Sequence, residues 1–135
     1  MTTETIIDVR YPDCDPMNIV HHAVYPIWYE IARMDFFDRV GFPWRDMHEL
    51  GIDPVMVNLN LEYLAPVRYP GTVTVKTRAV QCEGKKIRLR YECFCAGQCV
   101  NRAESFHIWA RELKSLRLDE ALPAVYARLA AAVEA

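Results

Sequence analysis

A helical pattern occupies residues 23–40, which read AVYPIWYEIARMDFFDRV. Apolar side chains recur there at intervals of three and four residues, the spacing that places them on one face of an α-helix. They are Val24, Ile27, Trp28, Ile31, Met34 and Phe37, widened by Ala32, Phe36 and Val40. Pro26 fits only the first turn, where the amides have no intrahelical acceptor, and Gly41 with Pro43 ends the pattern. The stretch predicts a long helix in a core.

Alternating apolar and polar residues on both sides of this helix predict a sheet. A first strand is expected over residues 5–11, before the turn residues Pro12 and Asp13. Four more strands are expected over residues 55–63, 73–79, 87–93 and 99–111. Short links between the last three strands indicate antiparallel neighbours. An apolar stripe over residues 122–133, with Asp119 as its N-cap, predicts a C-terminal helix.

One apolar face of such a sheet must be covered, and the helix at residues 23–40 is the long apolar element available. The sequence therefore predicts an α+β fold in which an antiparallel sheet wraps around a central helix. A length of 135 residues suits a single domain over residues 1–135.

The composition is that of a globular protein, with 52% hydrophobic and 25% charged residues. A net charge of -2 offers no general basic field for nucleic acid or an anionic membrane. Neither a signal sequence nor a run of ~20 apolar residues is visible, so we expect a cytoplasmic protein without a membrane partner. The five cysteines include Cys93 and Cys95, which share one strand face as small apolar residues. Without paired CxxC motifs, no metal is expected.

Titratable groups cluster just before the helix, in residues 11–25, YPDCDPMNIVHHAVY. The cluster holds Asp13, Asp15, His21 and His22. One interpretation is structural: the aspartates shape turns ahead of Pro16, and the histidines pack at the helix entry. The other is catalytic, because perturbed groups of this kind gather in active sites. The residues by themselves favour neither interpretation.

Residues 15–22, DPMNIVHH, resemble the signature of the hotdog-fold thioesterases of the 4-hydroxybenzoyl-CoA thioesterase family. The similarity continues through residues 25–33, YPIWYEIAR, and residues 63–71, YLAPVRYPG. Asn18 stands where the family usually has glycine, His21 replaces a common aromatic residue, and Val24 replaces a common asparagine. The resemblance implies a hotdog fold and hydrolysis of an acyl-CoA or aryl-CoA, with coenzyme A present only as part of the substrate and no other cofactor.

The resemblance also implies roles for particular residues. Asp15 matches the catalytic carboxylate, which acts as a general base or as a nucleophile, and both routes stay open. His22 matches an adjacent position and would donate to the carbonyl or orient Asp15. Amides around His22 and Ala23, at the helix start, would stabilise the oxyanion. Tyr25 is close enough in sequence to line the substrate pocket.

A predicted hairpin carries a basic group that fits contacts to the phosphates of coenzyme A: Lys85, Lys86, Arg88 and Arg90. Strand alternation explains the same residues as a solvated face, and nucleic acid is not indicated because no aromatic ladder accompanies them. Hotdog relatives assemble active sites between subunits, so a homo-oligomer is expected. A strand over residues 55–63 would extend the sheet across a dyad, giving a dimer or tetramer.

Two other functions remain open on the sequence. The same fold serves as a non-catalytic domain that binds acyl thioesters, or as a dehydratase of hydroxyacyl thioesters with its histidine and carboxylate arranged across subunits. Among the remaining polar residues, Glu30 and Arg33 have the spacing of an ion pair, within the helix or at a subunit interface. His48 and His107 show no partner pattern and are given no role.

Overall fold

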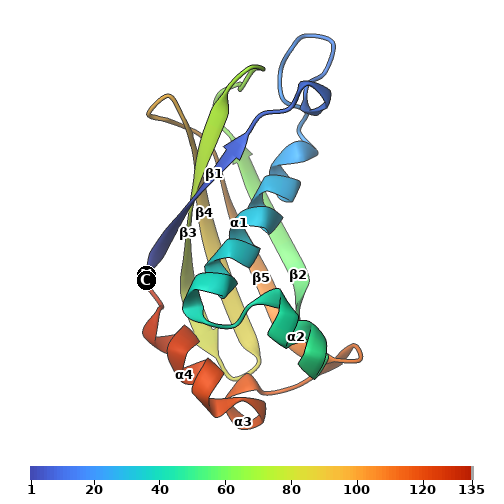
Figure 1. Cartoon of the computed structure of the whole chain (residues 1–135), viewed down its shortest axis with the longest axis vertical. Helices are drawn as coiled ribbons and strands as arrows, with labels where there is room; N and C mark the ends of the chain where they lie inside the picture. The colour runs from blue at the N-terminus through green and yellow to red at the C-terminus, as the bar shows by residue number, and fades with distance from the viewer. Residues whose placement is uncertain (135) are drawn as a thin grey trace.

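The computed structural model describes residues 1–134 and consists of one curled antiparallel sheet around a long helix (Figure 1). The strand order is β1-β3-β4-β5-β2, and a short β6 pairs with β5. The strands are β1 (Thr2–Asp8), β2 (Ile52–Tyr63), β3 (Thr72–Glu83), β4 (Lys86–Cys95), β5 (Gln98–Arg111) and β6 (Lys114–Ser115). The helix α1 (Val24–Val40) lies against the concave face. The predicted α+β architecture is confirmed.

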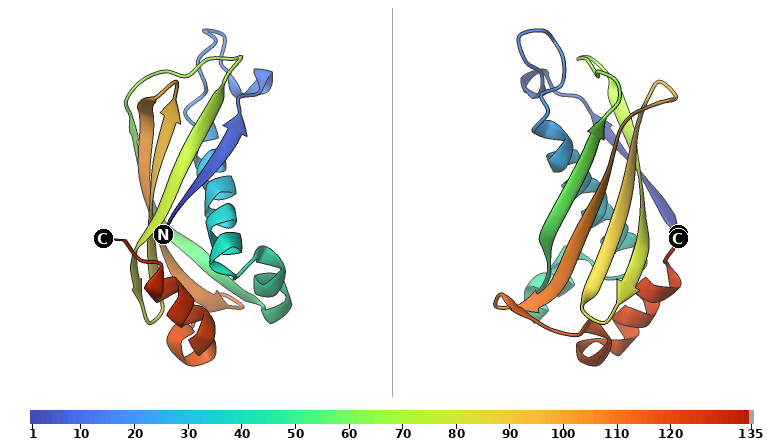
Figure 2. Two further views of the ribbon diagram at one scale, coloured as in Figure 1. Left: turned by 60° about the vertical axis from the view of Figure 1, so that its left-hand side comes forward. Right: turned by 180° about the vertical axis from the view of Figure 1, so that it is seen from behind.

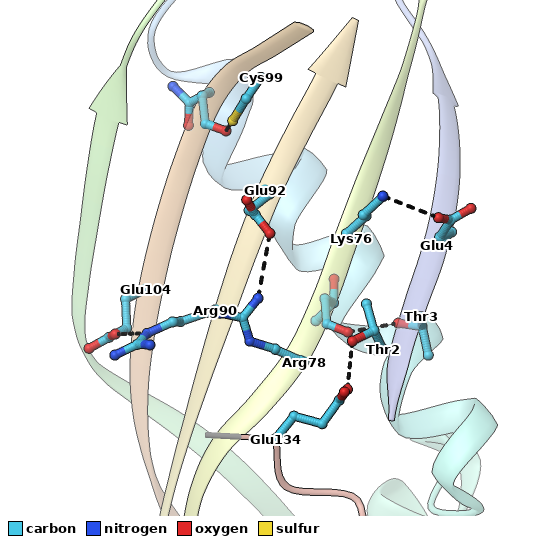
Figure 3. Close-up of polar contacts among 12 residues, drawn as sticks. Thr2, Thr3, Glu4, Lys76, Arg78, Arg90, Glu92, Cys99, Glu104 and Glu134 are labelled. Atoms are coloured by element: carbon cyan, nitrogen blue, oxygen red, sulfur yellow. Dashed lines mark hydrogen bonds and ion pairs between the residues drawn. The ribbon is translucent and has the colours of Figure 1, made fainter. Parts of the chain in front are cut away.

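The two faces of the sheet differ in chemistry, as the alternating pattern predicts. Side chains on the face toward α1 are buried, among them Val75, Leu89 and Cys93. The outer face carries ion pairs between neighbouring strands, shown in Figure 3. Arg78 lies 3.4 Å from Glu92, and Arg90 lies 2.7 Å from Glu104. No helix among residues 1–134 is long and apolar enough to cross a membrane.

The buried face of α1 differs from the predicted one. Ile27 and Ile31, both expected in the core, are 50% and 47% exposed. Trp28, Phe36 and Phe37 of the predicted face are buried as expected, and Tyr25 and Tyr29 are buried in place of the two isoleucines. Large aromatic side chains remove more apolar area from water than isoleucine does, which explains the rotation of the stripe.

Both termini also correct the sequence prediction. β1 starts at Thr2 and ends at Asp8, because its pairing with β3 runs from Thr2 opposite Arg78 to Asp8 opposite Thr72. At the other terminus, α3 (Leu118–Ala121) and α4 (Pro123–Ala131) replace the single predicted helix. Asp119 lies inside α3 and pairs with Arg117 at 2.7 Å, so its assignment as an N-cap was wrong.

The sheet has two distinct ends (Figures 1 and 2). At the loop end, the segment of residues 9–23 meets the β2–β3 connection, with the Val20 amide bonded to the Val67 carbonyl at 2.8 Å. At the helical end, α2 (Trp44–Leu50), α3 and α4 surround the β3–β4 turn, and the Leu118 amide donates to Gly84 O at 3.0 Å. Helix α1 begins at the loop end, which places its first turn beside residues 9–23.

A polar network crosses the interface between α1 and the sheet. Arg33 is only 8% exposed and donates to the Tyr91 hydroxyl at 3.2 Å. The Tyr91 hydroxyl contacts Ser105 Oγ at 2.6 Å, and His107 Nε2 lies 2.7 Å from Ser105 Oγ. His107 Nδ1 reaches the Pro54 carbonyl of β2 at 3.2 Å. The expected pairing of Arg33 with Glu30 inside the helix is absent from the described residues, because Arg33 points into the core.

His107 makes the stability of the fold depend on pH. Burial and the nearby Arg33 charge lower its pKa from 6.5 to about 4. Between these values the unfolded chain binds a proton that the folded protein does not, so stability falls as the pH drops. The loss is about 3 kcal/mol at most. We expect the free energy of unfolding, measured by urea denaturation, to fall between pH 7 and pH 4. In His107→Gln this free energy should fall less steeply with pH. Equal slopes for the two proteins would contradict this origin.

Candidate active site

Asp15 lies in a tight turn of the segment between β1 and α1. Its Oδ1 accepts the amides of Met17 at 2.9 Å and Ile19 at 3.2 Å. Asn18 completes the turn in a left-handed conformation with φ 58°, which asparagine tolerates better than most other residues. Its Nδ2 donates to the Tyr69 carbonyl at 3.1 Å. Among residues 1–134, Oδ2 of Asp15 has no hydrogen-bond partner, so this oxygen remains available.

Asp13, two residues earlier, has a different function. It is 1% exposed and accepts hydrogen bonds from the Arg10 amide at 2.7 Å and from Arg10 Nη2 at 2.8 Å. Both of its oxygens are therefore occupied by one residue. This pair stabilises the turn of Tyr11–Asp13 and leaves Asp15 as the carboxylate with a free oxygen.

The amide of His22, just before α1, has no hydrogen-bond partner among residues 1–134. Neighbouring amides have acceptors: His21 N bonds Asp13 O at 2.9 Å, Ala23 N bonds His21 Nδ1 at 3.0 Å, and Val24 N bonds His21 O at 3.0 Å. Within the described part of the chain, only the His22 amide of this run lacks a partner. The sequence suggested amides around both His22 and Ala23, but the Ala23 amide is occupied by the His21 ring.

A cavity of about 390 Å³ brings three of the predicted residues together. Asp15, His22 and Tyr25 line it, together with Ile19, Val20, Tyr63, Leu64, Ala65 and Pro66. The rings of Tyr25 and Tyr63 meet edge to face with centroids 5.5 Å apart. Burial raises the pKa of Tyr25 to about 12, so its phenol is neutral at physiological pH. The residues that line the cavity thus provide apolar walls, the Asp15 carboxylate and His22, whose amide has no partner among residues 1–134.

Sequence reasoning did not identify Tyr63 as part of this site. Its hydroxyl donates to the His22 carbonyl at 2.8 Å, across 41 positions of the chain. The position of Tyr63 at the end of a predicted strand indicates only that its side chain is exposed. Its contact with His22 depends on how β2 meets the segment before α1, which no local pattern shows. Asp15 also lines a second cavity of about 460 Å³, formed with Tyr11, Cys14, Pro16, Asn18 and Tyr69.

The predicted basic group is not near Asp15 within one chain. Lys85 and Lys86 lie at the helical end, in a cavity shared with Arg117 and next to the Leu118–Gly84 hydrogen bond. Arg88 is engaged on the sheet surface by Glu104, at 3.0 Å. The ten residues of β4 separate the two ends by about 30 Å. These residues therefore belong to a different end of the molecule from Asp15.

Burial raises the pKa of the Cys82 thiol to about 11, so this thiol stays protonated at physiological pH. Burial raises the pKa of the Cys93 thiol to about 12, so it stays protonated in the core. Over residues 1–134 no group of three or more His, Cys, Asp or Glu side chains is arranged to hold a metal ion.

The profile of the Thioesterase-like superfamily matches residues 9–129. The Bacillus subtilis protein named "Putative acyl-CoA thioesterase YneP" is 32% identical over 120 residues, 87% of each chain. The 4-hydroxybenzoyl-CoA thioesterase of a Pseudomonas species is 28% identical over 130 residues, 90% of this chain and 92% of that protein. Among solved structures, the DHNA-CoA thioesterase of Staphylococcus aureus superposes with a TM-score of 0.90 at 30% identity, covering 96% of this chain and 91% of its own. The chain therefore belongs to the thioesterase-like superfamily and has its hotdog fold.

Proposed function

We propose that this protein hydrolyses an acyl-CoA or aryl-CoA to the free acid and coenzyme A, with Asp15 as its catalytic carboxylate. The observation that carries the proposal is the pairing, at one cavity, of a carboxylate with a free oxygen and a backbone amide without a partner. The relatives named as thioesterases of acyl-CoA, 4-hydroxybenzoyl-CoA and DHNA-CoA support the same reaction class.

The His22 amide is the proposed oxyanion donor. As the tetrahedral intermediate forms, negative charge develops on the thioester oxygen, and a preorganised donor lowers the barrier by about 3 kcal/mol. The start of α1 adds a favourable dipole near this oxygen. The imidazole of His22 lies against that of His21, with centroids 4.1 Å apart, and would orient the carbonyl or Asp15.

Asp15 acts by one of two mechanisms, as a general base or as a nucleophile. As a general base it takes a proton from water, hydroxide adds to the carbonyl carbon, and collapse expels the coenzyme A thiolate, which regains the proton. As a nucleophile its Oδ2 displaces the thiolate to form a mixed anhydride, which water then hydrolyses. The acyl group would occupy the apolar part of the cavity, beside Tyr25.

Replacing Asp15 with Asn tests the carboxylate. The amide oxygen of Asn keeps an acceptor for Met17 and Ile19, so the turn should persist, whereas basicity and nucleophilic charge are lost. We expect kcat to fall roughly 100-fold or more, with a far smaller change in KM. A panel of acyl-CoA and aryl-CoA substrates with a thiol-trapping reagent measures the release of coenzyme A.

The exposed Asp38 provides the matched control, because Asp38→Asn makes the same chemical change on α1 toward the helical end. Near wild-type turnover of Asp15→Asn would refute the role of Asp15. Absence of coenzyme A release from every substrate would favour the binding domain, and hydration of an enoyl-CoA would favour the dehydratase.

We also propose a homodimer in which β2 strands of two copies pair antiparallel, with a tetramer arising from two such dimers. β2 is the edge strand beyond β5 and exposes apolar residues, including Val57 at 59%. Long apolar edges of this kind are normally paired or covered. A dyad at this edge reverses the second copy, so its helical end lies toward the loop end of the first.

This arrangement gives the basic group a function in a shared site. Lys85 of the partner subunit and Lys86 of the partner subunit would lie on the side of the Asp15 cavity, where they can meet the phosphates of coenzyme A. Arg88 is the weaker member of the group because Glu104 already neutralises it. The 30 Å separation within one chain is then no obstacle to a common substrate.

Complementation between defective subunits tests the shared site. The double variant Lys85→Ala, Lys86→Ala should have a higher KM for CoA thioesters but an unchanged KM for a truncated pantetheine thioester.

A mixed dimer of this double variant with Asp15→Asn can be isolated through two affinity tags. It contains one intact site if the lysines act across subunits. Its activity at low substrate should be about half that of wild type. A mixed dimer as poor as its parents, or a monomeric mass by light scattering, would rule out this arrangement.

A further inference from the structure

The peptide group between His22 and Ala23 is held at both of its polar atoms. Its carbonyl oxygen accepts a hydrogen bond from the Tyr63 hydroxyl at 2.8 Å. Its N–H donates to Nδ1 of His21 at 3.0 Å. A peptide that is restrained at both the N–H and the C=O cannot rotate without breaking one of these bonds.

The preceding peptide carries the free His22 amide and is restrained as well. Its carbonyl, that of His21, accepts the Val24 amide at 3.0 Å, and the His21 amide donates to Asp13 O at 2.9 Å. The direction of the His22 N–H is therefore set by fixed peptides on both sides. His21 and Tyr63 supply the two side-chain bonds of this frame.

We propose that His21 and Tyr63 are positioning residues that aim the His22 amide at the thioester oxygen, an inference that rests on the proposed hydrolase function. His21 acts through Nδ1, which accepts the Ala23 amide. Nδ1 must therefore carry no proton, and the proton of the neutral ring is on Nε2. Tyr63 acts through its hydroxyl. A phenyl ring at position 21 would stack on His22 but would leave the Ala23 amide without this acceptor.

The chemistry of these contacts gives a direct rescue experiment. His21→Ala removes the acceptor, whereas His21→Asn restores it, because an asparagine side-chain oxygen accepts the amide two residues further on. Tyr63→Phe removes only the hydroxyl. We expect His21→Ala and Tyr63→Phe each to lower kcat about 10-fold with less than a twofold change in KM, because misalignment of a transition-state donor affects turnover. His21→Asn should recover most of kcat.

Two matched controls lie at the helical end. Tyr126→Phe also deletes a hydroxyl that donates to a backbone carbonyl, that of Cys82 at 3.4 Å. His48→Ala also removes an exposed imidazole, one that stacks on Trp44. Both should keep wild-type kcat. Equal losses in the controls would show a general effect on stability and overturn the positioning role.

The double variant separates a shared role from two independent ones. Because both bonds restrain one peptide, His21→Ala combined with Tyr63→Phe should cost less than the product of the single effects. A double variant whose loss in kcat equals the product of the two single losses overturns the proposal. Single variants with kcat within twofold of wild type overturn it as well. A His21→Asn variant with kcat as low as that of His21→Ala has the same consequence.

Hydrogen exchange at the Ala23 amide provides a readout that needs no turnover. We expect His21→Ala to speed this exchange severalfold and His21→Asn to restore protection, because the amide loses and regains its acceptor. Unchanged exchange overturns the proposal even if no thioester is hydrolysed, whereas an inactive wild type with altered exchange in the variant would count only against the hydrolase function.

Discussion

Burial of the aromatic stripe of α1 is the interaction on which the rest of the structure depends. Phe36 and Phe37 are completely buried, and Phe37 meets Trp109 of β5 with ring centroids 5.7 Å apart. Each such side chain contributes about 2 kcal/mol by leaving water, which favours a sheet curled closely around the helix. Because α1 runs along the sheet (Figure 2), this packing also brings its first turn to the loop end.

Apolar contacts alone would leave α1 free to slide along the sheet, and the polar network removes that freedom. The Arg33 charge is costly to bury unless it is hydrogen-bonded, so the helix is held where its guanidinium reaches the Tyr91 hydroxyl. The contacts of Tyr91 and His107 with Ser105 extend this constraint to β4 and β5. The helix position, and with it the place of His22 beside Asp15, is specified by directional bonds in the core.

The candidate site arises because most polar groups around it are hydrogen-bonded to one another, whereas a few are left without a partner. The Asp15 turn, the segment before α1 and the end of β2 occupy most of their donors and acceptors among themselves. Among residues 1–134, one carboxylate oxygen of Asp15 and the amide of His22 have no hydrogen-bond partner, and both residues line the cavity. Free polar groups next to apolar walls interact strongly with a substrate, because little water competes for them. The same bonds that order the loop therefore leave a pair suited to attack a thioester.

The sequence by itself determined the central helix, the strands and the Asp15 segment, because the spacing of apolar residues and the turn residues around Pro16 act over a few positions. Family resemblance added the hotdog fold and the thioesterase class. Only the tertiary structure decided that Ile27 faces outward, that Arg33 bonds Tyr91, that the Ala23 amide is occupied, and that Lys85 lies far from Asp15. The contact between Tyr63 and His22 belongs to this second group. Such contacts join residues tens of positions apart, and they follow from strand register and helix rotation, which are set by packing of the whole core and leave no local pattern in the chain.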